Sequence, residues 1–146
     1  MRRLLLRTDR LYLVLPAVVP MAIDFAVTLL GQHPRYWDGY RLVEESTRLW
    51  RSLMFIHPAA FVAGGMLYAG IAAVGIYFLP KLLAWWLSIV LLVTHVSGAR
   101  SWLWKFSGDH FVLWEVTLHG SMALLATVCY LKASRQRQDL PLLFQA

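Results

Sequence analysis

Four long apolar runs dominate this sequence and restrict what it can fold into. Each has about 20 or more mainly apolar residues, the length that a helix needs to cross the hydrocarbon core of a bilayer. No water reaches that core, so the backbone groups must be bonded within the segment, as they are in an α-helix. The sequence therefore predicts one all-α domain, an integral membrane four-helix bundle. The predicted spans are residues 11–31, 53–79, 82–104 and 111–131, followed by a polar tail over 132–146.

Composition and charge fit a membrane protein better than a soluble one. The chain is 59% hydrophobic and 15% charged, whereas soluble domains carry about 25% charged residues. The net charge of +6 comes from basic residues that lie mainly at the ends of the apolar runs. That pattern indicates membrane orientation, and we expect no nucleic-acid partner. Cys129 is the single cysteine, which excludes an internal disulfide and a CxxC motif.

The first run predicts a retained helix rather than a cleaved signal peptide, because about 20 apolar residues exceed the usual 7–15 of a signal sequence. Pro16 and Pro20 predict a kink in its first half. Small residues repeat at four-residue spacing over 60–73, so we expect the second span to be the packed centre of the bundle.

The longest polar connection, residues 32–52, is rich in tyrosine and tryptophan, as membrane interfaces are. Residues 40–51 predict a short helix on the membrane surface, with Leu42, Val43 and Leu49 directed inward. We expect this loop to cover whatever the helices hold.

Four spans place both termini on the same side. That side carries the larger share of lysine and arginine, which favours cytoplasmic termini and a multi-pass protein of the inner membrane.

Ionisable side chains inside a membrane span are costly and therefore informative. At about 1.5 Å per residue, three of them lie about 10–13 Å below the non-cytoplasmic surface and the others about 6 Å below it. All of them fall in the outer half of the bundle, on the side of the long loop. The six groups are Asp24, His57, His95, Arg100, Glu115 and His119.

These side chains admit several interpretations. A polar network that fixes helix packing would use them together with Thr28, which shares a helix face with Asp24. His95 and Arg100 are five residues apart, so they cannot both point at one centre.

A ligand site is the second interpretation. A zinc, copper or iron ion could be held by His95, His119, Glu115 and Asp24. A haem could lie between His95 and His119. The same groups could relay protons, or Asp24 and His95 could act as acid and base on a lipid headgroup.

A series of short motifs runs through the first half of the chain, formed by Asp24, Thr28, Gly31, Glu45, His57, Pro58 and Phe61. In these residues the chain resembles a family of small bacterial membrane proteins grouped under a domain of unknown function. The resemblance covers residues 20–65 and implies a small membrane protein without a known reaction. Ser46 and Thr47 depart from it, because they stand where the family has Asn-Pro.

Small size, abundant tryptophan and the lack of a large soluble segment in this sequence lead to our functional expectation. We expect a non-enzymatic accessory or assembly subunit of a larger membrane complex, in contact with the lipid bilayer and with other membrane subunits or a second copy. The alternative is a metal- or haem-binding protein.

Overall fold

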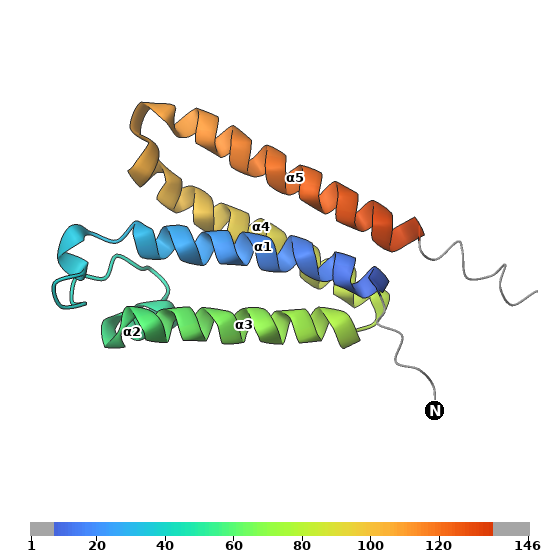
Figure 1. Cartoon of the computed structure of the whole chain (residues 1–146), viewed down its shortest axis with the longest axis horizontal. Helices are drawn as coiled ribbons and strands as arrows, with labels where there is room; N and C mark the ends of the chain where they lie inside the picture. Colours follow the sequence, from blue (N-terminus) through green and yellow to red (C-terminus); the bar gives the residue numbers. More distant parts are fainter. Residues whose placement is uncertain (1–7, 136–146) are drawn as a thin grey trace, which may run out of the picture.

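The computed structural model describes residues 8–135, and in that range the regular elements are helices (Figure 1). Four of them, α1, α3, α4 and α5, are long and apolar enough to cross a membrane. This confirms the all-α prediction and the four candidate spans, whereas most of the tail over 132–146 lies outside the described residues. The elements are α1 (Thr8–Leu30), η1 (Pro34–Tyr36), α2 (Arg48–Ile56), α3 (Pro58–Phe78), α4 (Lys81–Ser107), η2 (Gly108–His110) and α5 (Phe111–Arg135).

The predicted start of the second span at residue 53 is wrong, because the helix is interrupted between α2 and α3. His57 is extended, with φ −174° and ψ 146°, and α3 begins at Pro58. Proline disfavours the helical conformation in the residue before it and is well suited to the first position of a helix. His57 Nδ1 accepts a hydrogen bond from the backbone N–H of Ala59 at 3.0 Å, so this histidine caps α3.

The packed centre of the bundle is α1, so the prediction that the second span has this role is wrong. α1 contacts α3, α4 and α5 and lies between α3 and α4 (Figure 1). The small-residue pattern of α3 does allow a close approach, since a Cβ added at Gly65 would lie 3.1 Å from the ring of Phe25 in α1. The helix α1 continues through Pro16 and Pro20, whose side chains are fully buried.

The loop does not form the predicted surface helix over 40–51. Tyr40 has a positive φ of 58°, and regular helix begins only at Arg48. Leu42 and Leu49 are exposed, and only Val43 of the three packs against the loop's core. The loop packs instead around a buried cluster of Tyr36, Met54 and Phe61, which leaves Leu42 and Leu49 outside.

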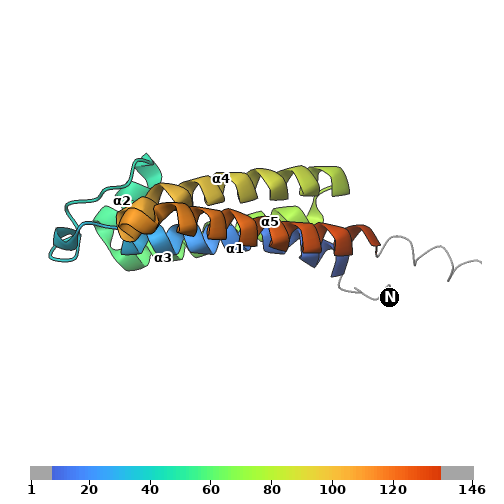
Figure 2. The same cartoon turned by 90° about the horizontal axis from the view of Figure 1, so that it is seen from above.

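The loop, α2 and the α4–α5 turn gather at one end of the bundle, which we call the loop end (Figure 2). The α3–α4 turn lies at the opposite end. A buried hydrogen bond from the Tyr36 hydroxyl to the Met54 carbonyl oxygen, 3.1 Å, fastens the loop to α2. This bond keeps the loop against α2 at the loop end.

Candidate polar site at the loop end

Asp24 of α1 and His95 of α4 form a polar pair, in which His95 is buried and Asp24 is partly buried. Oδ2 of Asp24 lies 2.7 Å from Nδ1 of His95, and the side chains are 16% and 7% exposed. The tautomer of the imidazole decides which of the two atoms donates this hydrogen bond. The rings of Phe25 and Tyr68 flank the imidazole, with centroids 5.7 and 5.9 Å away.

Gly98 makes room for this pair, one turn after His95 on α4. A Cβ at this position would lie 2.6, 2.7 and 2.8 Å from Oδ2, Oδ1 and Cγ of Asp24. Real Cβ atoms do not approach that closely. A glycine is therefore needed for the carboxylate of α1 to lie directly against α4.

A cavity of about 360 Å³ extends from this pair toward the loop. It lies between α1, α4 and residues 44–50, with Phe61 of α3 on its wall. Its lining combines carboxylates, hydroxyls and aromatic rings. The residues are Asp24, Phe25, Thr28, Glu44, Glu45, Ser46, Thr47, Trp50, Phe61, Thr94, His95, Gly98, Ser101, Trp102 and Lys105.

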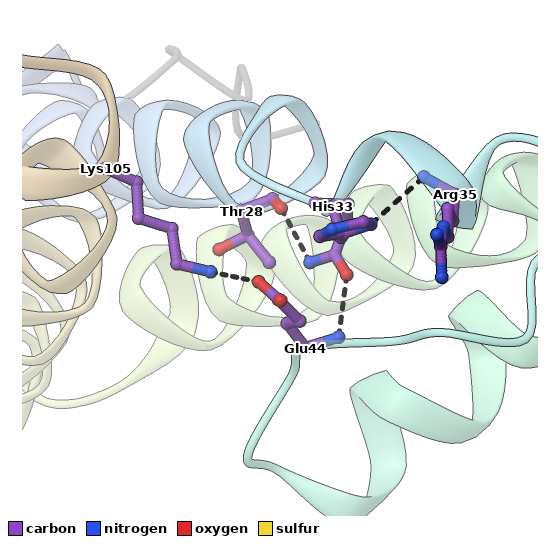
Figure 3. Close-up of polar contacts among 6 residues, drawn as sticks. Thr28, His33, Arg35, Glu44 and Lys105 are labelled. Carbon is purple, nitrogen blue, oxygen red and sulfur yellow. Dashed lines mark hydrogen bonds and ion pairs between the residues drawn. The ribbon is translucent and has the colours of Figure 1, made fainter.

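Polar contacts hold the loop against the helices beside this cavity (Figure 3). Lys105 at the end of α4 forms an ion pair with the Glu44 carboxylate. The Gln32 side chain accepts a hydrogen bond from the Glu44 backbone N–H at 2.9 Å and donates one to the Thr28 carbonyl oxygen at 3.0 Å. Sequence reasoning missed Gln32, Glu44 and Lys105, because Gln32 and Glu44 belong to the loop and Lys105 lies beyond the predicted end of the third span at residue 104.

The other predicted site residues do not line this cavity. Arg100 forms an ion pair with Glu115 of α5, on a different face of α4 from His95, as the five-residue spacing predicts. His119 is exposed on α5, with Nδ1 2.8 Å from the Glu115 carbonyl oxygen of its own helix. His57 is exposed at the α2–α3 corner, where its ring meets Tyr40 edge-on.

The structure thus divides the proposed metal ligands among three places. Asp24 is hydrogen-bonded to His95, and Glu115 forms an ion pair with Arg100. His119 is hydrogen-bonded to a carbonyl oxygen of its own helix. Within residues 8–135, no three His, Cys, Asp or Glu side chains are placed to hold a metal ion together. Of the predicted polar network, Thr28 does lie with Asp24 and His95, on the wall of the cavity.

No family model, curated protein or solved structure matches this chain. The resemblance of residues 20–65 therefore rests on its short motifs, and the function has to be argued from the geometry.

Proposed function

We propose that this protein is a non-enzymatic subunit of a larger membrane complex, with α1, α3, α4 and α5 crossing the bilayer as a four-helix bundle. Large apolar side chains on the outer faces support contact with lipid, among them Met66 (71% exposed), Phe78 (75%) and Val112 (68%). The distribution of lysine and arginine supports cytoplasmic termini and a loop end on the other side of a bacterial inner membrane.

One observation carries the subunit proposal, the exposed imidazole of His119. It lies about 12 Å along α5 from Phe111, inside the candidate span Gly108–Ser134. Ionisable groups in spans nearly always face protein or a water-filled cavity. Contact of this imidazole with lipid is unfavourable, which supports a transmembrane helix of another subunit packed over it.

The burial of the four spans points to the same helix. In the most apolar stretch of each span, 17% of the residues of α5 are buried, compared with 22% for α3 and 33% for α1 and α4. The hydroxyls of Thr117, Ser121 and Thr127 already bond to carbonyl oxygens of α5, so they need no further partner. His119 and the half-exposed pair Arg100–Glu115 are the groups for which a covering helix would matter most.

Photo-crosslinking in native membranes tests this proposal. A photoreactive residue at position 119 is expected to give one discrete product with a second membrane protein, and His119→Leu is expected to weaken co-purification of that protein. The matched control is the same probe at Met66, an exposed position of α3 that should react with lipid. A product of twice the chain's mass would show self-association instead, and a lone monomer would refute a partner.

A further inference from the structure

We propose that the cavity at the loop end binds a primary ammonium group, such as that of an ethanolamine phospholipid or of a small soluble amine. This inference does not depend on the subunit proposal. The cavity of about 360 Å³ falls in the range of about 300–1,000 Å³ that is usual for small-ligand sites. Since the loop end is where the spans meet the bilayer surface, the headgroup of a lipid is within reach.

The charges that line the cavity favour a cation. Three carboxylates, those of Asp24, Glu44 and Glu45, share the lining with one ammonium, that of Lys105. Lys105 is paired with Glu44, so carboxylates are in excess among the lining residues. Asp24 bonds to His95, and Glu45 accepts a hydrogen bond from the Thr47 backbone N–H at 2.7 Å, while Arg51 donates to the Glu45 carbonyl oxygen at 2.6 Å. An excess of one sign of charge in a cleft attracts ions of the opposite sign.

Aromatic rings supply a surface that an ammonium group prefers. Phe25, Trp50 and Phe61 meet edge to face, with centroids 4.9 to 5.9 Å apart. Cations are attracted to the faces of such rings. The cavity already contains one example, because the Lys105 ammonium lies 4.3 Å from the centroid of Trp102.

Hydrogen-bond acceptors distinguish a primary from a quaternary ammonium. Thr28 and Thr94, which carry hydroxyl groups, line the cavity together with Asp24. His95 also lines the cavity; it is 6% exposed, and its buried Nε2 has no hydrogen-bond partner within residues 8–135. A primary ammonium brings three N–H donors to these atoms, whereas a quaternary ammonium brings none.

Binding measurements on the full-length protein test the proposal in two arms. The first titrates ethanolamine and choline onto protein in nanodiscs of phosphatidylglycerol, followed by calorimetry. The second counts bound phosphatidylethanolamine and phosphatidylcholine by native mass spectrometry. We expect the primary amine to bind about tenfold more tightly than the quaternary one in at least one arm, the difference that a charge-assisted hydrogen bond produces. Binding in the first arm identifies a soluble amine, and binding only in the second identifies a lipid.

Two variants locate the site. Asp24→Asn and Glu45→Gln are each expected to weaken binding about tenfold through the loss of one carboxylate charge. The matched control is Asp38→Asn, an exposed loop carboxylate outside the cavity, which should leave binding unchanged. Glu45→Gln keeps the proposal testable if Asp24→Asn fails to fold. Equal or tighter binding of the quaternary amine, an unchanged affinity in both variants, or no binding in either arm would overturn the proposal.

Discussion

At the end of the bundle away from the loop, the helices meet mainly through apolar side chains. The side chains of Arg10, Lys81 and Ser88 add hydrogen bonds to the carbonyl oxygens of Leu79, Ala133 and Leu13. Leu13 and Ala17 of α1, Ile76 of α3, Ala84 of α4 and Ala133 of α5 are fully buried there. At the loop end, α1 meets α4 through the pair Asp24–His95, α4 meets α5 through Arg100–Glu115, and α4 meets the loop through Lys105–Glu44. The same helices are thus held by close packing at one end and by paired polar groups beside a cavity at the other.

The two kinds of contact respond differently to change. Dispersion contacts and buried apolar area are spread over many atoms, so a small substitution at the apolar end removes only part of the packing energy there. A buried polar pair is less tolerant, because removal of one partner leaves the other without compensation. Single substitutions at the loop end should therefore lower the free energy of unfolding most, and small substitutions at the opposite end should lower it less.

The largest effect is expected at the pair Asp24–His95. Asp24→Leu or His95→Leu should each lower the free energy of unfolding by about 3 kcal/mol, since each leaves a buried partner unpaired. The double variant Asp24→Leu/His95→Leu should lose much less than the sum of the two. Unfolding in mixed detergent micelles measures this cycle, and additive losses would mean that the two side chains do not interact.

Gly98→Ala should be the next most damaging change. Its methyl group would overlap the Asp24 carboxylate, and overpacking of this kind costs about 1–3 kcal/mol. Gly120→Ala on α5 is the matched control, because a Cβ there meets nothing within 4 Å. The control should gain up to about 1 kcal/mol from the better helix propensity of alanine. The same unfolding assay compares them, and equal effects at both positions would argue against the close approach of α1 and α4.

The sequence was sufficient for the parts of this fold that depend on local pattern. Hydropathy locates the four spans, and helical spacing puts Asp24 with Thr28 and separates His95 from Arg100. Pro58 also predicts the interruption between α2 and α3, since proline disfavours the helical conformation in the residue before it. The prediction of a continuous span from residue 53 gave that proline too little weight.

The rest depended on how segments far apart in the chain meet. Glu44 and Lys105 are 61 residues apart and become partners only through the path of the loop. The depth of His119 follows from its position in the span, but its exposure depends on how α5 packs against α1 and α4, which no local pattern specifies. The pairing of Asp24 with His95, rather than with Glu115 or His119, has the same origin.

A smaller effect should appear at Ser88, a buried polar group at the apolar end. Its hydroxyl donates to the Leu13 carbonyl oxygen at 2.7 Å and lies 3.2 Å from the Tyr130 hydroxyl. Ser88→Ala should cost about 1.5 kcal/mol, because neutral hydrogen bonds contribute less than buried charged pairs. The measurement is again detergent unfolding, beside Asp24→Leu. A larger loss at Ser88 than at Asp24 would reverse the proposed contrast between the two ends.

The smallest effect, and a pH-dependent one, is expected at Tyr36, where the loop itself is fastened. Burial raises the pKa of the Tyr36 hydroxyl above its usual 10.0, and the neighbouring Tyr40 raises it further. In the unfolded chain this hydroxyl ionises near pH 10, while in the folded chain it keeps its proton to higher pH. Its contribution to stability is therefore complete below pH 10 and is lost as pH rises through the pKa of the folded state.

Tyr36→Phe removes the hydrogen bond to Met54 and should cost about 1 kcal/mol at pH 8. The variant lacks the alkaline loss, so the gap between wild type and variant should narrow between pH 8 and pH 11. A gap that stays constant over this range would mean that the hydroxyl is not buried in the folded loop.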